Sequence, residues 1–322
     1  MSGGERPETD DVHEVVVSGI LPEAFGVVSL LLKPVGDEKL PSWEPGAHID
    51  LILGLDLERQ YSLCGDLGDP FQWQVSVLRE PESRGGSACV HEMLQVGDVL
   101  RYRGPRNNFA LQPVDEYLFI AGGIGITPIL PMIARCTADN LNWRLVYGGR
   151  SKASMAFTTM LAEHGERVTF WPQDTLGLID LDTLLAEPRP GVAIYSCGPE
   201  PLLAAVEDRC QAWPTGTLHL ERFRPRQGAL DGPSTAFEVE LEESGMVLEI
   251  PAEESILDIL ESAGIFVPNS CREGTCGTCE TVVLEGTPDH RDSYLTSEEQ
   301  AAGEIILVCC SRSLSKRLVL DL

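Results

Sequence analysis

Apolar positions in the first third of the chain are gathered in short strand-like runs, which Pro and Gly separate at close spacing. This pattern is typical of an antiparallel barrel. The expected strands are Val12–Ile20, Val27–Leu32, Ala47–Leu53, Gln60–Cys64, Gln72–Leu78 and Asp98–Tyr102. A short helix precedes the last of them. We therefore expect residues 1–112 to form an antiparallel β-barrel domain.

The pattern changes in the second third, where apolar strands alternate with helical stretches. Such alternation predicts a parallel sheet with crossover helices. The expected strands are Tyr117–Ala121, Trp143–Tyr147, Val168–Phe170 and Val192–Ser196. We expect an α/β domain over residues 113–228.

A third pattern follows a linker that is rich in Gly, Pro and Arg, over residues 224–235. It begins with the strand pair Phe237–Leu241 and Val247–Ile250 and continues with a helix over Ile256–Ala263. We expect the linker and an α+β domain to occupy residues 229–322, so that the whole chain is a multidomain protein.

The ends of the helix expected in the third domain carry their own signals. Ser255 is suited to cap its first turn, with Asp258 three residues on, and Gly264 is suited to end it.

The chain is acidic, with 50 acidic and 24 basic side chains among 322 residues and a formal charge of −26. This balance argues against nucleic acid and against an anionic membrane surface as partners. The N-terminal residues are polar and acidic, and no apolar run approaches the roughly 20 residues of a membrane span. We expect a cytoplasmic protein and a monomer.

Ten cysteines are many for a cytoplasmic chain, and five of them lie between residues 271 and 310. Clustered cysteines in a reducing compartment indicate metal ligands rather than disulfides. The spacing Cys271-x4-Cys276-x2-Cys279, with the distant Cys309, is that of a plant-type [2Fe–2S] cluster. The pair Cys276 and Cys279 alone could begin a zinc ribbon, but the first spacing and the single distant cysteine argue against zinc.

The spacing leaves the fourth ligand open, because Cys310 directly follows Cys309. Neighbouring residues of a strand point to opposite faces, so on a strand only one of the two would face the cluster.

Two segments of the first domain suggest a flavin site. Arg59, Gln60, Tyr61 and Ser62 follow one another on an expected strand, and Gly85, Gly86 and Ser87 open a short helix. An arginine and a helix that begins with glycines can hold a phosphate, and a flat aromatic ring can pack on a flavin. Alone, an arginine and a tyrosine on a strand are more often surface residues.

Two strand-to-helix turns of the second domain suggest a nicotinamide site, because ligands of parallel sheets lie at the carboxyl ends of the strands. The first turn contains Gly122, Gly123, Gly125, Thr127 and Pro128, and the second contains Cys197, Gly198 and Pro199. Arg150 and Ser151 follow a third strand, where an adenosine ribose is expected. A 2′-phosphate on Arg150 would mean NADPH, but we favour NADH.

These motifs resemble the ferredoxin–NADP reductase superfamily, whose signature is Arg-x-Tyr-Ser. The order of flavin, nicotinamide and ferredoxin parts resembles the phthalate dioxygenase reductase family. The segments 153–157 and 289–292, the run VCCSR and the end LVLDL add to this resemblance. The resemblance implies that the fourth cluster ligand is Cys309 and that the flavin is FMN.

The resemblance also implies roles for single residues. Arg59 would bind the flavin phosphate, and Tyr61 and Ser62 would contact the isoalloxazine ring. Cys197 would lie beside the reacting nicotinamide carbon as a positioning residue. Phe223 would lie by the flavin, although a packing role at a hinge is an equal alternative. Ser62, Cys197 and Phe223 are thus the residues expected nearest the reaction.

The implied function is a reductase that passes electrons from NADH through FMN and a [2Fe–2S] cluster to a Rieske-type aromatic oxygenase, a dioxygenase or an O-demethylase. A different acceptor, such as a cytochrome P450 or a separate ferredoxin, is the first alternative. A redox sensor with little turnover is the second. Residues 236–322 carry a net charge of −13, half of the total, which suits docking to a basic partner as well as solubility alone.

Overall fold

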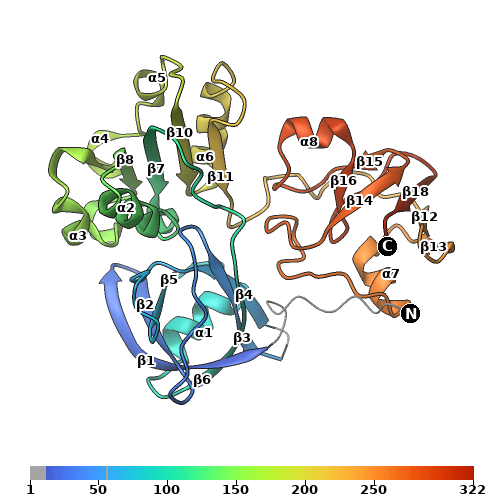
Figure 1. Ribbon diagram of the computed structural model, residues 1–322, viewed down its shortest axis with the longest axis horizontal. Helices are drawn as coiled ribbons and strands as arrows, with labels where there is room; N and C mark the ends of the chain where they lie inside the picture. The colour runs from blue at the N-terminus through green and yellow to red at the C-terminus, as the bar shows by residue number, and fades with distance from the viewer. Residues whose placement is uncertain (1–11, 56) are drawn as a thin grey trace. The chain divides into compact units, whose positions relative to one another are not determined.

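The computed structural model describes residues 12–55 and 57–322, and the chain divides into two compact units between Glu221 and Arg222 (Figure 1). Two separate sheets lie in the first unit, and a five-stranded and a two-stranded sheet lie in the second. The three expected domain ranges stay predictions. Among the described residues, no helix combines the length and apolar character that crossing a bilayer requires.

The first sheet is antiparallel and has six strands in the order β4-β3-β6-β1-β2-β5. Its elements are β1 (His13–Ala24), β2 (Val27–Pro34), β3 (His48–Gly54), β4 (Leu57–Ser62), β5 (Trp73–Leu78), α1 (Gly86–Glu92) and β6 (Val99–Arg106). Leu63, directly after β4, pairs with Val75 of β5, so the two edges of the sheet meet there. The curled antiparallel sheet confirms the fold expected from the strand spacing.

Apolar side chains on alternate positions fill the inside of this curled sheet. Val15 and Val17 of β1 are buried, as are Leu30 and Leu32 of β2. This period of two is what a pleated strand requires when only one face is covered.

The second sheet is parallel and has five strands in the order β11-β10-β7-β8-β9. Its strands are β7 (Glu116–Gly122), β8 (Asn142–Gly149), β9 (Val168–Pro172), β10 (Val192–Cys197) and β11 (Leu218–Glu221). Its helices are η2 (Gly123–Ile126), α2 (Ile129–Ala138), η3 (Lys152–Ser154), α3 (Thr158–Ala162), η4 (Gly165–Arg167), α4 (Gln173–Leu176), α5 (Leu181–Leu184) and α6 (Glu200–Arg209). This sheet confirms the expected α/β architecture.

The chain order of the parallel sheet reverses between β7 and β10. The chain runs outward through β8 and β9 and then returns to the other side of β7. All six residues of β10 are buried, as in a strand that is covered on both faces. The carboxyl ends of β7 and β10 are therefore neighbours, which is where open α/β sheets bind their ligands.

The second unit has a mixed five-stranded sheet in the order β13-β12-β18-β14-β16 and a separate pair formed by β15 and β17 (Figure 1). Its elements are β12 (Phe237–Leu241), β13 (Met246–Ile250), α7 (Ile256–Ser262), β14 (Glu280–Glu285), β15 (Pro288–Asp289), α8 (Ser297–Ala302), β16 (Ile305–Leu307), β17 (Arg312–Ser313) and β18 (Arg317–Leu320). The central strands β12 and β18 are parallel, and the other pairs are antiparallel.

Helix α7 begins and ends as its sequence predicts. The Ser255 side chain accepts from the Asp258 backbone N–H at 3.1 Å, and the Asp258 carboxylate accepts from the Ser255 N–H at 3.3 Å. Gly264, just past the helix, has a φ of +79°. The buried face of this helix, Ile256, Leu257 and Leu260, packs into the core of the second unit.

Candidate functional site

The cysteine-rich loop between α7 and β14 follows a tightly turned path. Arg272, Gly274 and Gly277 all have positive φ, of 54°, 68° and 72°. A Cβ on Gly274 would lie 2.4 Å from Cys310 Sγ, and a Cβ on Gly277 would lie 2.5 Å from the Tyr294 ring. The loop therefore requires glycine at these positions for conformation and for space.

The sulfurs of four cysteines gather at this loop. Cys271 interacts with Cys276 and Cys309, and Cys309 also interacts with Cys279. Three of the four are buried, and Cys271 is half-buried. The structure thus brings together the four cysteines that the sequence selected as cluster ligands.

Hydrogen-bond donors already surround one of these sulfurs. The backbone N–H groups of Glu273 and Thr275 each donate to Cys271 Sγ at 3.4 Å. Thiol hydrogen bonds from Cys276 and Cys309 lower the pKa of Cys271. Backbone amides aimed at a sulfur that readily carries negative charge are what a thiolate-ligated cluster needs.

The four cysteines approach one another as a chain of neighbours rather than around one point. Among the described residues, no three His, Cys, Asp or Glu side chains are placed to hold a single metal ion. A [2Fe–2S] cluster divides four thiolates between two irons. The donor set and its backbone amides fit that cluster.

The strand argument about Cys309 and Cys310 is wrong, because both lie in a turn after β16. Within this turn the Cys309 side chain contacts Cys310 as well as Cys271 and Cys279. Cys309 faces Cys271 and Cys279, whereas Cys310 Sγ lies 3.9 Å from the Leu307 carbonyl oxygen, against Gly274. Cys310 thus packs beside the loop and also touches Cys309, so the choice of Cys309 as the fourth ligand stays a prediction.

The two segments of the expected flavin site lie together. Arg59 on β4 donates through Nη2 to the Arg84 carbonyl oxygen at 2.7 Å and through Nη1 to that of Glu58 at 2.7 Å. A Cβ on Gly86 would lie 2.6 Å from Arg59 Cγ, and Gly85 has a φ of +94°. Glycine at these positions lets the arginine stem cross the start of α1.

The other residues expected at the flavin site differ in burial and in hydrogen bonding. Ser62 is buried and Tyr61 is half-buried, and burial raises the pKa of the Tyr61 phenol. Gln60 Nε2 lies 3.3 Å from His48 Nε2. The Ser87 hydroxyl donates to Ser83 Oγ at 3.0 Å and accepts from the Glu80 N–H at 3.1 Å, so it braces the loop before α1.

A buried ion pair in the same sheet was not foreseen from the sequence. Arg106 at the end of β6 pairs with Asp50 of β3, whose side chain is fully buried. The two residues are 56 positions apart in the sequence, and no local pattern links them.

The two turns of the expected nicotinamide site touch each other through glycines. A Cβ on Gly125 would lie 2.3 Å from the Cys197 carbonyl oxygen. A Cβ on Gly122 would lie 2.7 Å from Pro199 Cδ and 3.4 Å from Gly198 Cα. No side chain fits between the turns, so their backbones form one continuous floor at the sheet edge.

Neighbouring groups fix the shape of the first turn. Gly123 accepts from the Tyr147 hydroxyl at 3.1 Å, and Thr127 Oγ1 donates to the Ile124 carbonyl oxygen at 3.0 Å. Pro128, which has no N–H to leave unpaired, precedes α2.

The residues after β8 lie at the same end of the sheet. Arg150 is exposed, and its carbonyl oxygen accepts from the Asp174 N–H at 3.1 Å. Ser151 and Ser154 cap η3 reciprocally.

Cys197 has a partner that sequence reasoning missed, Glu221 at the end of β11. The two residues are paired in register, and Cys197 Sγ donates to Glu221 Oε2 at 3.8 Å. Burial raises the pKa of Cys197 well above its ordinary value and the pKa of Glu221 to about 8. Burial therefore favours the neutral form of both groups, and a buried thiol of this kind is a poor nucleophile.

Phe223 belongs to the second unit and has 41% of its surface exposed. Its place beside the flavin stays a prediction.

Comparisons with known proteins identify the families of two parts of the chain. Residues 239–314 match the family described as 2Fe-2S iron-sulfur cluster binding domain, and residues 119–208 match the oxidoreductase NAD-binding domain. The first match contains all four cysteines, and the second contains both glycine turns.

The chain is 41% identical to the phenoxybenzoate dioxygenase subunit beta of Ectopseudomonas oleovorans, over 93% of this chain and 95% of the relative. The solved structure of phthalate dioxygenase reductase, titled as a modular structure for electron transfer from pyridine nucleotides to [2Fe-2S], is 35% identical, with a TM-score of 0.71, over 97% of this chain and 98% of that one. Further relatives are named as reductase components of oxygenase systems.

An intact type IV self-sufficient cytochrome P450 monooxygenase is 41% identical, with a TM-score of 0.88, and the match covers all of this chain. The chain spans only 42% of that monooxygenase. From the two domain matches and the similarity along the whole chain, we conclude that the protein is an oxidoreductase that belongs to the phthalate dioxygenase reductase family.

Proposed function

We propose that the protein is an NADH-dependent reductase that holds FMN and a [2Fe–2S] cluster and delivers electrons to a Rieske-type oxygenase of aromatic compounds. The observation that carries the proposal is the gathering of Cys271, Cys276, Cys279 and Cys309, in a chain that also has a nicotinamide-type sheet edge. The flavin, when bound, takes electrons in pairs from NADH and gives them singly to the cluster.

The cluster would be held by these four cysteines, with the Glu273 and Thr275 amides donating to Cys271. The match to phthalate dioxygenase reductase supports Cys309 as the fourth ligand, and so does its contact with Cys271 and Cys279. Cys310 is engaged by the Leu307 carbonyl oxygen and the Ser311 hydroxyl.

The FMN phosphate would be held by Arg59 with the glycine-rich start of α1, Gly85 to Ser87. Gln60, Tyr61 and Ser62 would line the ring. Support comes from the meeting of Arg59 with Gly86, which joins two segments far apart in the sequence. The family resemblance supports FMN over FAD.

The nicotinamide cofactor would lie on the floor formed by the turns after β7 and β10. Gly122, Gly123, Gly125, Thr127 and Pro128 supply one half of this floor, and Cys197, Gly198 and Pro199 supply the other. Cys197 would position the nicotinamide, because its side chain is buried and is held by Glu221. Arg150 and Ser151 would lie by the ribose, with NADH preferred, and Phe223 would lie by the flavin.

We propose a monomeric, cytoplasmic protein whose partner carries a basic docking patch. The second unit is acidic, and opposite charge would speed the encounter and make it sensitive to salt. The test is electron delivery from NADH to purified oxygenases at rising salt concentration. Faster delivery to a Rieske-type oxygenase that falls with salt is expected, and equal rates with unrelated acceptors would contradict a specific partner.

A cytochrome P450 acceptor is the second candidate, because the full length of this chain matches part of a self-sufficient P450 monooxygenase. The same assay separates the two candidates. Preferential reduction of a P450 haem over a Rieske cluster would replace the first proposal by the second.

A further inference from the structure

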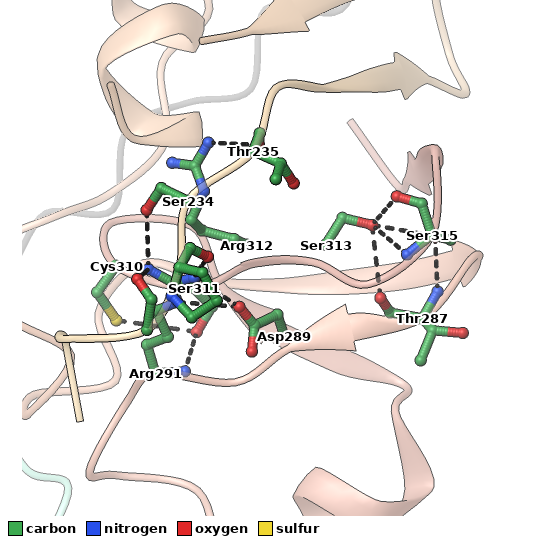
Figure 2. A network of polar contacts seen from close by, with 12 residues as sticks. Ser234, Thr235, Thr287, Asp289, Arg291, Cys310, Ser311, Arg312, Ser313 and Ser315 are labelled. Atoms are coloured by element: carbon green, nitrogen blue, oxygen red, sulfur yellow. Dashed lines mark hydrogen bonds and ion pairs between the residues drawn. The ribbon is translucent and has the colours of Figure 1, made fainter. Parts of the chain in front are cut away.

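Two arginines of the second unit, Arg291 and Arg312, are almost completely buried, with 6% of each exposed. Arginine is rarely buried unless its charge and its donors are paired. Neither residue is a candidate cluster ligand, and Figure 2 shows that both reach toward the linker before β12.

Every N–H donor of the Arg291 guanidinium is used. Nε and Nη2 donate to Asp289 Oδ2 at 2.9 and 2.8 Å, which leaves three donors for other groups. These bind linker atoms: the Gly232 carbonyl oxygen at 3.2 Å, Ser234 Oγ at 3.1 Å and the Pro233 carbonyl oxygen at 2.6 Å. The guanidinium fork fits this set of five contacts, which an ammonium group could not make.

Arg312 holds the next linker residue. It donates to the Thr235 carbonyl oxygen at 3.1 Å and to the Pro251 and Glu254 carbonyl oxygens at 2.7 and 2.8 Å. Its guanidinium also lies over the Phe237 ring, 5.2 Å from the centroid. Linker residues 232–235 are thus bound by two adjacent side chains (Figure 2).

Apolar burial does not hold this part of the linker, because residues 231–236 are exposed. Its hydrogen bonds to the two arginines therefore fix its path. A further contact lies upstream, where the Arg226 N–H donates to Ser293 Oγ at 2.7 Å. The Gly- and Pro-rich segment 226–235 is bound at three places.

The same residues that hold the linker also contact the two segments that carry the cysteines. The Ser293 N–H donates to the Gly274 carbonyl oxygen at 2.8 Å. The Arg291 N–H donates to Ser311 Oγ at 3.1 Å, and Ser311 lies two residues after Cys309. The backbone of residues 291–293 therefore binds the cysteine loop at Gly274 and the residue Ser311 after Cys309, while the Arg291 side chain binds the linker.

We propose that Arg291 is a positioning residue that joins the linker 226–235 to the segment carrying Cys309, so that the linker forms part of the cluster site. This inference rests on the proposed function in so far as the loop holds a [2Fe–2S] cluster. A displaced linker would leave a buried guanidinium without three of its acceptors, and the 291–293 backbone would then be free to shift against Gly274 and Ser311.

The test compares Arg291→Ala and Arg291→Lys with Arg317→Ala in the full-length protein. Arg317 is the matched control, because it also binds carboxylates, those of Glu238 and Glu240, but on the surface of the same unit. Two properties are measured: the rate at which trypsin cuts after Arg226, and the visible circular dichroism and midpoint potential of the cluster.

We expect Arg291→Ala to be cut about tenfold faster than the wild type, since cleavage follows the population of the opened linker. We also expect its cluster dichroism and potential to change. Arg291→Lys should fall between the wild type and Arg291→Ala, because lysine keeps the charge but lacks the planar set of donors. Arg317→Ala should behave as wild type. Wild-type cleavage, or faster cleavage with an unchanged cluster spectrum and potential, would overturn the proposal.

Gly232→Ala disturbs the same contact from the linker side. It provides a second test if Arg291→Ala does not fold. Its Cβ would lie 3.2 Å from Arg291 Cζ, and five hydrogen bonds oppose a shift of that guanidinium. The exposed neighbour Asp231→Ala is its control. Faster cleavage and an altered cluster spectrum are expected for Gly232→Ala alone, and identical behaviour of the two variants would overturn the proposal.

Failure of the proposed function is recognised separately. If the wild-type protein binds no iron–sulfur cluster, the function and the inference about the cluster site both fail, while the trypsin assay still reports whether Arg291 fastens the linker.

Discussion

The replacement Gly274→Ala tests whether the path of the cysteine loop depends on a residue without a side chain. The added Cβ would lie 2.4 Å from Cys310 Sγ and 2.9 Å from Asp292 Cα. A sulfur can rotate away, but a backbone carbon cannot, so the loop itself must shift. Gly274 also has a φ of +68°, which alanine adopts only with strain.

The magnitude follows from two contributions. The left-handed conformation costs an L-residue about 1–2 kcal/mol, and the smaller entropy of unfolded alanine returns about 0.4–1 kcal/mol. Overpacking adds about 1–3 kcal/mol. The matched control is Gly245→Ala, with a φ of +64° and no atom within 4 Å of the added Cβ, so it carries the first contribution alone. The difference between the variants is therefore about 1–3 kcal/mol.

The assay heats both full-length variants and follows the loss of visible cluster absorbance, with the iron content of each measured beforehand. In a unit of this size, 1 kcal/mol lowers the midpoint by about 4–8 °C. Gly274→Ala should therefore lose its absorbance at least about 4 °C below Gly245→Ala. Equal midpoints with equal iron content would refute the close contact at Gly274.

Three further predictions concern the other sites. Gly125→Ala places a Cβ 2.3 Å from the Cys197 carbonyl oxygen and should raise the KM for NADH at least about tenfold. The KM is measured by flavin reduction, and an unchanged value would contradict the contact between the two turns. Cys309→Ser should lose the cluster absorbance that Cys310→Ser keeps, and the reverse result would exchange their roles. Burial raises the pKa of Glu221 to about 8, so the folded protein loses stability as the pH rises from the ordinary carboxyl pKa through that value. Glu221→Gln should abolish this loss. Parallel melting-temperature profiles of variant and wild type between about pH 5 and about pH 8 would therefore contradict the raised pKa of Glu221.

Sequence reasoning works best where a local pattern has one physical cause. The cap of α7 by Ser255 and Asp258 needs only neighbouring residues, and the structure confirms it. The glycine turns after β7 and β10 are also local signals, and the order of parallel strands places them at one edge. The three fold types follow from the same periodicities.

Sequence reasoning fails where a contact joins distant residues or where the local conformation differs from the assumed one. The strand argument for Cys309 fails because the chain turns after Leu307. Glu221 gives no sequence signal beside Cys197, since only the register of β10 with β11 brings them together. The composition of the linker gives no sign of what holds it, because carbonyl groups, which every sequence has, bind it to Arg291.

The central claim is that one chain carries electrons from NADH through a flavin to its own iron–sulfur cluster. The most direct measurement is anaerobic addition of NADH to the purified protein, with iron, sulfide and FMN quantified and the visible spectrum recorded over time. The account predicts that flavin and cluster absorbance both bleach, with NADH more effective than NADPH. A flavin that bleaches beside an unchanged cluster, or a protein that binds zinc in place of iron and sulfide, would contradict it.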